Sequence, residues 1–299
     1  MPFTLSHPAA VLPLLRQPFV APALVAGAMA PDVPYFLRAV GIHSDSAQDA
    51  YEPLLNATTT HSPGWGLAVD LLFTLCLMAA YRLLRRPVAA LLPFRIGPTG
   101  PVPESGPRTP LRYGFWLLLS AFLGIASHLL WDSFTHADGF LVTHVAALRH
   151  PAVGGLTVAR LLQYVSTAGG LLAIGAHLWR RRKPRPGKGT VARPRPGARW
   201  GVAVVLAGTA LLGGAVQARA DFPLYRYETV ADLDRPIVRV FEDGSTDTSY
   251  PTRTVEAPWG RVAEGVLTGA AKTAGAAFAV ALLVYSAGWH VRRSLRRNG

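Results

Sequence analysis

Five blocks of apolar residues, each long enough to cross a bilayer, constrain the fold of this chain more than any other feature. A membrane-spanning helix needs about 20 predominantly apolar residues, because the hydrocarbon core is about 30 Å thick. The five blocks run approximately over Gly64–Leu84, Tyr113–Leu130, Thr157–Trp179, Trp200–Val216 and Val266–Trp289. Each block is predicted to be helical, since lipid offers no hydrogen-bond partner to an unpaired backbone amide.

The composition favours a membrane protein over a soluble one. Half of the 299 residues are hydrophobic and only 16% are charged, whereas a soluble domain carries about 25% charged residues. Six tryptophans lie near the ends of the apolar blocks, as in the aromatic belts of membrane proteins; they are Trp65, Trp116, Trp131, Trp179, Trp200 and Trp289. The alternative of buried helices in a large soluble protein is therefore disfavoured.

The basic residues set the predicted orientation of the helices. Lys and Arg concentrate in the cytoplasmic loops of membrane proteins. Here they follow the first block, fill the connector Arg180–Arg199 with nine cations and no acid, and follow Trp289. If the blocks alternate in direction, these regions share one side, and Glu104 is the only one of 17 carboxylates there. The sequence therefore predicts a multi-pass protein of the inner (cytoplasmic) membrane with a cytoplasmic C-terminus.

The connectors divide the chain into predicted domains. The basic residues 181–199 form a Pro- and Gly-rich linker that is predicted to be disordered and to contact anionic lipid headgroups rather than nucleic acid. This linker separates residues 1–180 from a C-terminal two-helix segment, 200–299. Within that segment, the loop 219–265 contains the alternating run Pro236–Phe241. The run predicts a small extracytoplasmic hairpin, with a plain solvated loop as the alternative.

The first 30 residues are apolar but interrupted. Ala9–Leu15 and Phe19–Ala30 are separated by Arg16–Pro18, and neither part can span a bilayer. We expect two short helices that form a re-entrant hairpin or lie at the interface, which returns Asp32 to the side of His7. A single tilted crossing is the alternative, and it would separate these two residues. With the five blocks, the predicted fold is an all-α integral membrane protein.

A group of His and Asp residues closes the second apolar block at its predicted outer end. His128 and Asp132 are four residues apart in the segment Ser127–Gly139, so they share one helix face. His136 extends this face by another turn if the helix continues. Imidazole and carboxylate at this spacing can bind a divalent metal, and a simple hydrogen-bonded pair has the same spacing.

Three further polar elements are predicted on the same side of the membrane. They contain His7, Asp32 and His61. In addition, Asp70 lies about two turns inside the first span, where an ionised carboxylate is costly and usually has a partner. Carboxylates and histidines that meet at one membrane face would suit a divalent metal. A polar network that ties the helices together is the alternative.

The opening Met1–Pro13, MPFTLSHPAAVLP, resembles that of a bacterial membrane family of unknown function. Members of that family carry a Pro-Asp element like Pro31–Asp32, a Thr-His-Ser element like Thr60–Ser62, and a Ser-His-x-x-x-Asp-x-x-Thr element like Ser127–Thr135. The order of these elements is also distantly similar to inner-membrane metal-dependent hydrolases of the YdjM type, which are compared with zinc-dependent phospholipase C. The resemblance covers roughly residues 1–180.

The resemblance implies a divalent metal cofactor, most readily Zn²⁺. In the YdjM-type pattern an Arg often precedes the Thr-His-Ser element, whereas Thr58 and Thr59 occupy that stretch here, so an anion-binding Arg is missing at this position. The metal-ligand candidates that the resemblance implies are His7, Asp32, His61, His128 and Asp132, with His136 as a further candidate.

These observations favour a metal-dependent hydrolase that acts on an amphiphilic or lipid-linked (phospho)ester at the extracytoplasmic face. The metal would lower the pKa of a bound water, and a carboxylate that does not bind it, Asp32 or Asp70, would act as general base. The alternative is a non-enzymatic membrane protein whose cluster is structural or senses metal or protons. A transporter is disfavoured, because the sequence has no clear inverted repeats.

Overall fold

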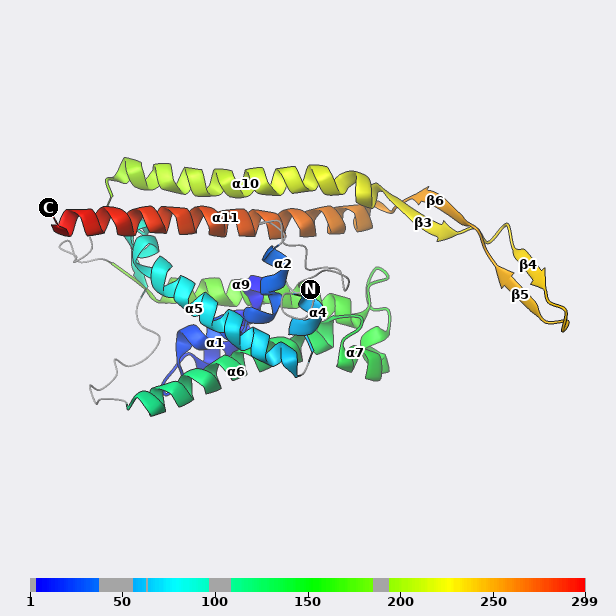
Figure 1. Ribbon diagram of the computed structural model, residues 1–299, viewed down its shortest axis with the longest axis horizontal. Coiled ribbons are helices and arrows are strands. Elements are labelled where there is room, and N and C mark those ends of the chain that lie inside the picture. The colour runs from blue at the N-terminus through cyan, green and yellow to red at the C-terminus, as the bar shows by residue number, and fades with distance from the viewer. Residues whose placement is uncertain (1–3, 38–55, 63, 97–108, 185–193, 299) are drawn as a thin grey trace. The chain divides into compact units, whose positions relative to one another are not determined.

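The computed structural model describes a chain that divides into two compact units, and its helices and strands are drawn in Figure 1. Unit 1 comprises Met1–Arg199 together with Leu283–Gly299, and unit 2 comprises Trp200–Leu282. The residues whose structure is described are 4–37, 56–62, 64–96, 109–184 and 194–298.

Unit 1 is built from three long helices that are connected by short ones (Figure 1). The long helices are α5 (Trp65–Leu91), α6 (Pro110–Thr135) and α9 (Val158–Arg180). A two-residue antiparallel ladder pairs β1 (Arg95–Ile96) with β2 (Arg182–Lys183). The short helices are η1 (Thr4–Leu14), α1 (Ala21–Gly27), η2 (Ala30–Asp32), α2 (Val33–Leu37), α4 (Ala57–Thr60), α7 (Phe140–His144) and α8 (Ala146–Arg149), of which η1 and η2 are 3-10 helices.

Unit 1 also includes the C-terminal residues, which the sequence assigned to the same predicted domain as the hairpin. His290 Nε2 lies 3.0 Å from the carbonyl oxygen of Leu83 on α5. The units therefore differ from the predicted domains 1–180 and 200–299, because the end of the last helix contacts the first long helix.

Five helices in the described part of the chain are long and apolar enough to cross a membrane, in agreement with the five predicted blocks. All five extend beyond their blocks, the third by a single residue, because polar and basic residues continue the helix past the apolar stretch. The five stretches are Trp65–Leu91, Pro110–His144, Val158–Arg180, Pro196–Arg226 and Trp259–Leu295.

The N-terminal segment folds back on itself, as two of the three predicted paths require. Helix η1 packs against α9, and α1 packs against both α5 and α6. The fold-back brings both ends of the segment to one residue of α6: the His7 ring stacks on His128, and Asp32 Oδ1 lies 3.6 Å from His128 Nε2. The alternative of a single tilted crossing, which would separate His7 from Asp32, is wrong.

Helices α1 and α6 cross with their backbones in close contact at Gly27 and Gly124. A Cβ at Gly124 would lie 2.4 Å from the carbonyl oxygen of Leu24, and a Cβ at Gly27 would be equally close to the α6 backbone. Only glycine fits at such a crossing. The close approach brings the carbonyl group of Ala28 to within 2.9 Å of the His128 ring.

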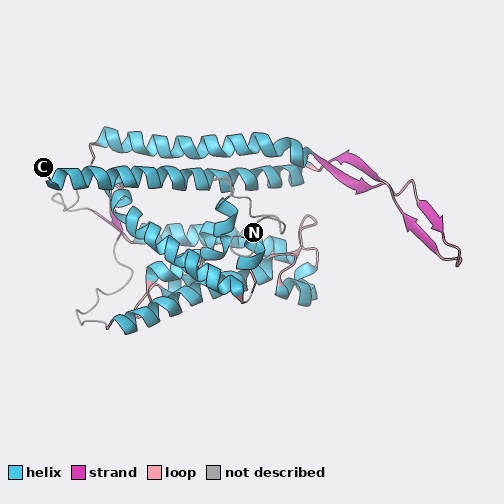
Figure 2. Cartoon of the chain, viewed as in Figure 1, coloured by secondary structure: helices cyan, strands magenta, loops and turns pink. Residues whose placement is uncertain are grey.

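Unit 2 contains most of the last two helices and the β-structure between them, drawn in magenta in Figure 2. The helices are α10 (Pro196–Arg226) and α11 (Trp259–Asn298). Two antiparallel ladders follow one another along the hairpin: β3 (Tyr227–Ala231) with β6 (Thr252–Glu256), and β4 (Ile237–Val240) with β5 (Thr246–Ser249).

The strands confirm a hairpin between the last two helices, but it is shorter than the predicted loop of 219–265. Helix α10 continues to Arg226, and α11 begins at Trp259. The reason is that polar residues are satisfied inside the helix, since Gln217 Nε2 donates a hydrogen bond of 2.8 Å to Asp221 Oδ1. Sequence patterning placed these residues outside the helix because of their polarity alone.

Parts of three predictions lie outside the described residues. They concern residues 185–193 of the linker, Met1–Phe3 of the opening motif, and Glu104 in the connector before α6. The predicted disorder of residues 185–193 stays a prediction for this reason. It is wrong at both ends of the linker, because Arg182–Lys183 form β2 and residues 196–199 belong to α10.

We expect Gly124→Ala to lower the melting temperature of the detergent-purified protein, because overpacking of a tight contact costs about 1–3 kcal/mol. Gly114→Ala on the same helix is the matched control, since a Cβ there meets nothing within 4 Å and alanine favours a helix by about 0.5–1 kcal/mol over glycine. Thermal unfolding followed by circular dichroism measures both variants. Equal melting temperatures would contradict the close crossing of α1 and α6.

Candidate metal centre

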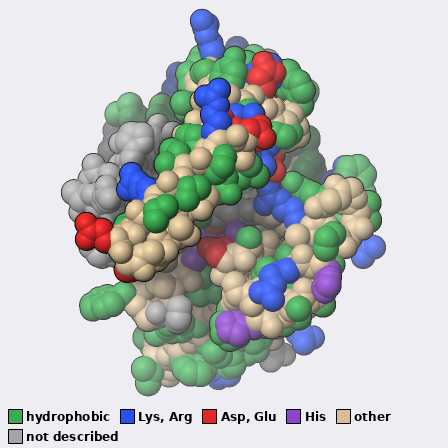
Figure 3. Space-filling view, turned by 90° about the vertical axis from the view of Figure 1, so that its right-hand side faces the viewer, with side chains coloured by type: hydrophobic (Ala, Val, Ile, Leu, Met, Phe, Trp, Pro, Cys, Tyr) green, Lys and Arg blue, Asp and Glu red, His purple; other side chains and the backbone are tan. Residues whose placement is uncertain are grey.

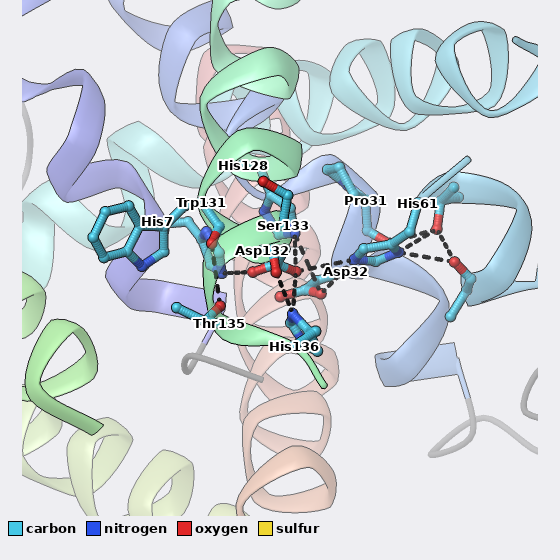
Figure 4. Close-up of polar contacts among 12 residues, drawn as sticks. His7, Pro31, Asp32, His61, His128, Trp131, Asp132, Ser133, Thr135 and His136 are labelled. Atoms are coloured by element: carbon cyan, nitrogen blue, oxygen red, sulfur yellow. Dashed lines mark hydrogen bonds and ion pairs between the residues drawn. The ribbon is translucent and has the colours of Figure 1, made fainter. Parts of the chain in front are cut away.

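The last turns of α6 present the two central residues of the predicted cluster. His128 and Asp132 lie one turn apart on the same helix face, with 0% and 5% of their surface exposed. His128 Nε2 lies 3.3 Å from Asp132 Oδ2. The predicted i, i+4 geometry is therefore present, and both side chains point into the protein (Figure 4).

Two N-terminal segments bring further ligand atoms to this pair (Figure 4). Asp32 ends η2, and its Oδ1 lies 3.6 Å from Nε2 of both His61 and His128. His61 follows α4, and its Nε2 lies 3.4 Å from Asp132 Oδ2. The four residues that each offer one ligand atom within 4.8 Å of the others are Asp32, His61, His128 and Asp132, and this group could hold a metal ion.

Backbone carbonyls orient both imidazoles of the group. His128 Nδ1 lies 2.9 Å from the carbonyl oxygen of Ala28, and His61 Nδ1 lies 2.8 Å from that of Ala57. Because a carbonyl oxygen can only accept, each Nδ1 carries the proton and each neutral ring keeps a lone pair on Nε2. Metal-binding histidines are commonly held in this way, with the second ring nitrogen hydrogen-bonded to a carbonyl or carboxylate.

The ligand atoms of the group have no hydrogen-bond partner in the described part of the chain. This holds for Nε2 of His61 and His128 and for both carboxylate oxygens of Asp32 and Asp132, all of which are buried. Buried polar atoms without a partner are rare in proteins, and two neighbouring carboxylates repel one another when both are ionised. A divalent cation among these atoms would offset both costs, so the donor set fits a metal.

His7 and His136 flank the group, and both contact Asp132. His7 Nε2 lies 3.5 Å from Asp132 Oδ1, and its ring stacks on that of His128 with centroids 3.8 Å apart. His136 follows the last residue of α6, and its Nδ1 lies 3.5 Å from Asp132 Oδ2. All six predicted metal-ligand candidates therefore lie together, four in the central group and two beside it.

His7 and His61, which lie outside the long helices, have pKa values shifted in opposite directions. Burial and, to a smaller extent, the neighbouring His128 ring lower the pKa of His7 to about 3, so His7 is neutral at physiological pH. Burial also lowers the pKa of His61, but the carboxylates of Asp132 and Asp32 raise it, and the net pKa lies above the ordinary 6.5. A cation bound at these carboxylates would compete with protonation of His61.

Asp70 lies on the second turn of α5 and is fully buried. It is close enough to His61, His128 and Asp32 for their charges to interact with its carboxylate. Neither of its carboxylate oxygens has a hydrogen-bond partner among the described residues. Asp70 is not one of the four residues of the metal-competent group, but its carboxylate interacts electrostatically with three of them.

Thr60 links the two N-terminal ligand segments, a role that sequence reasoning missed. Its Oγ1 donates a buried hydrogen bond of 2.7 Å to the carbonyl oxygen of Pro31, which connects the residue before His61 to the residue before Asp32. Asn56 caps the N-terminus of α4 with its side chain. The cap has a local sequence signal, whereas the contact between Thr60 and Pro31 has none, because it joins segments that are distant in the chain.

The site is open on one side. The side chains of His61 and His136 are 22% and 24% exposed, whereas that of His128 is 0% exposed. Figure 3 shows histidine and acidic side chains among those exposed on one face of the molecule. An open position distinguishes catalytic metal sites from closed structural ones.

The comparison with protein families places the chain in one of them. The family model described as "Domain of unknown function (DUF4184)" matches residues 1–287. The chain belongs to this family. No curated protein and no solved structure matches the chain. The predicted membership of a family of unknown function is confirmed, and the distant similarity to YdjM-type hydrolases stays a prediction.

We expect Thr60→Val to weaken metal retention and Thr60→Ser to preserve it, because only a hydroxyl can donate to the Pro31 carbonyl. An unsatisfied buried acceptor costs about 1–3 kcal/mol, or roughly 5- to 150-fold in affinity if the site bears the whole cost. Metal content after dialysis against increasing chelator concentrations measures the effect. If the valine variant retains metal as the wild type does, Thr60 does not position the ligands.

Proposed function

We propose that this protein is a membrane-bound, divalent-metal-dependent hydrolase that acts on an amphiphilic or lipid-linked (phospho)ester at the extracytoplasmic face. The observation that carries the proposal is the convergence of ligand atoms from Asp32, His61, His128 and Asp132 within 4.8 Å. Imidazole and carboxylate donors with an open side are typical of catalytic metal sites.

The location in a membrane is supported by the surfaces of the long helices. Leu111, Leu172 and Leu211 are 85%, 74% and 74% exposed, and many other large apolar side chains are exposed with them. Soluble monomers rarely expose contiguous apolar patches of more than a few hundred Å². A hydrocarbon environment removes the cost of this exposure, since lipid tails are as apolar as leucine.

The outward orientation of the site is supported by the distribution of charge in unit 1. Its described carboxylates lie near the end where α5 begins and α6 ends, and they are Asp32, Asp70, Asp132 and Asp138. Basic residues gather where α5 and α9 end. Because cytoplasmic loops are rich in Lys and Arg, the proposal places the basic end and the C-terminus in the cytoplasm and the metal site on the opposite side of the inner membrane.

Zinc is the ion that we propose for the site. The four separations between an imidazole nitrogen and a carboxylate oxygen of the group are 3.3–3.6 Å. They are close to the roughly 3.3 Å expected between ligands about 2.0–2.1 Å from a tetrahedral Zn²⁺. Mg²⁺ and Ca²⁺ prefer sites made of oxygen ligands alone, and two of the four donors here are imidazole nitrogens.

Asp32 and Asp70 are the two candidates for the general base, and we assign their roles according to which of them belongs to the metal-competent group. When bound, a divalent ion polarises an ester oxygen and lowers the pKa of a coordinated water to about 7. Asp32 belongs to the group, so we assign the role of general base to Asp70, the other predicted candidate. Its buried carboxylate lies beside the group and can take up a proton. His7 and His136 flank Asp132 and are positioned to orient the substrate.

An amphiphilic substrate is supported by aromatic side chains near the open side. Trp65 starts α5 four residues after His61 and is 82% exposed, Trp131 precedes Asp132 and is 36% exposed, and Phe140 starts α7 and is 67% exposed. Tryptophan in particular favours the membrane–water interface. A substrate whose apolar part stays in lipid would present its ester group at this depth.

A structural or sensing metal is the second candidate function. The observation that favours it is that the four ligands come from three separate segments, so that an ion would also tie η2 and α4 to α6. The exposure of His61 and His136 favours the catalytic alternative, and turnover decides between the two.

We expect the detergent-purified protein to contain near-stoichiometric metal and Asp132→Asn to lose most of it. The reason is that the Asp132 carboxylate contacts all four histidines of the site. Asp138→Asn is the matched control, because Asp138 is exposed and follows the same helix. Elemental analysis by mass spectrometry measures the metal. Equal metal content in the two variants would contradict the metal site.

We expect Asp70→Asn to keep its metal and to lose hydrolytic activity, because the amide has the same shape but cannot take up a proton. General bases contribute about 10²- to 10⁴-fold to rate, so the activity should fall by at least about 100-fold. Release of nitrophenol from p-nitrophenyl esters and phosphoesters of increasing chain length measures turnover. If the metal-loaded wild type hydrolyses none of them and no phospholipid, the structural alternative is favoured.

A further inference from the structure

The end of unit 1 opposite the metal site carries concentrated positive charge that the proposed hydrolase chemistry does not use. We call it the basic end. It is formed by the last turns of α5 and α11, the β1–β2 ladder, and Arg199 in the first turn of α10. Its residues are Arg82, Arg85, Arg86, Arg95, Arg182, Lys183, Arg199, Arg292 and Arg293.

Three contacts hold these segments together although they are far apart in the chain. The β1–β2 ladder joins the residues after α5 to those after α9. Arg199 Nε donates to the carbonyl oxygen of Leu91 at 3.0 Å, and His290 Nε2 lies 3.0 Å from the carbonyl oxygen of Leu83. The positive charges are therefore gathered by the fold itself.

The β1–β2 ladder places two cations directly opposite one another. Arg95 pairs with Lys183, and both strands are exposed. Like charges opposite one another in an antiparallel pair destabilise it. Neither cation forms an ion pair within the described part of unit 1, where the carboxylates lie near the other end of the helices. An anion bound between Arg95 and Lys183 would remove this repulsion.

Two tryptophans next to arginines of the basic end indicate how deep this end would lie in a membrane. The guanidinium carbon of Arg182 lies 3.0 Å from the ring centroid of Trp179, and that of Arg293 lies 5.3 Å from the ring centroid of Trp289. Tryptophan side chains concentrate at the level of the lipid headgroups. The arginines stacked on them therefore lie where headgroup phosphates would be.

We propose that the basic end binds the phosphate of anionic phospholipid headgroups, with Arg95 and Lys183 as the central pair. The apolar faces of α5 and α9 adjoin these cations, with Leu83 39% and Leu178 43% exposed. A lipid can occupy both surfaces at once, since its acyl chains cover the helices while its headgroup neutralises the cations. Nucleic acid would neutralise the charge and leave the apolar faces uncovered.

The test uses the full-length protein in a neutral detergent, with phosphatidylglycerol and phosphatidylcholine of identical acyl chains as probes. Native mass spectrometry measures the affinity for each lipid. Phosphatidylglycerol should bind more tightly, and Arg95→Ala/Lys183→Ala should weaken its binding about 25-fold, because each cation near a lipid surface contributes about fivefold. The charge-conserving exchange Arg95→Lys/Lys183→Arg should keep the preference.

The matched control is Arg149→Ala/Arg239→Ala, which removes the same charge from exposed positions outside the basic end and should leave lipid binding unchanged. Equal binding of the two lipids, or an unchanged preference in the Arg95→Ala/Lys183→Ala variant, would overturn the proposal. Inorganic phosphate and single-stranded DNA serve as competitors at equal concentration. If either displaces phosphatidylglycerol completely, the site recognises a free anion or a nucleic acid instead of a lipid.

Discussion

The burial of two carboxylates among imidazoles at the end of α6 is the constraint on which the rest of unit 1 depends. Asp32 is 0% exposed and Asp132 is 5% exposed, and a buried ionised carboxylate is costly unless it is paired or coordinates a metal. The chain meets this requirement by bringing η1, η2 and the residue after α4 to one face of α6. Each of these segments contributes an imidazole or a carboxylate to the cluster.

Contacts between side chains and backbone carbonyls hold this arrangement in place. The glycine crossing of α1 and α6 lets the carbonyl group of Ala28 reach the His128 ring, 100 residues further along the chain. In the same way, the hydrogen bond from Thr60 to the Pro31 carbonyl joins the segments of His61 and Asp32. Orientation by backbone carbonyls leaves the second imidazole nitrogen of each histidine available, which a metal ligand requires.

Unit 1 separates its charges along its long helices. The described carboxylates lie near the end where α6 closes, most of the cations lie where α5 and α9 end, and the surface between them is largely apolar. In a bilayer, this separation would place the proposed hydrolase chemistry and the proposed lipid contacts at opposite faces. The two could then be altered independently, because few residues contribute to both.

The sequence by itself determined the features that depend on one continuous segment. Apolar blocks of bilayer length predicted five long helices, and the four-residue spacing predicted that His128 and Asp132 share a face, because helix geometry relates these positions directly. Motif order and family resemblance pointed to His7, Asp32 and His61 as further members of the site. The helix ends were predicted less well, since polar residues such as Asp221 are satisfied within α10.

Only the tertiary structure decided how these segments meet. The sequence left the N-terminal path open between a fold-back and a single crossing, and the structure selects the fold-back through contacts of His7 and Asp32 with α6. It also shows which ring nitrogens are available and that Asp70 lies beside the metal-competent group. Such features arise from packing between distant segments, which the local periodicity and spacing of a single sequence do not encode.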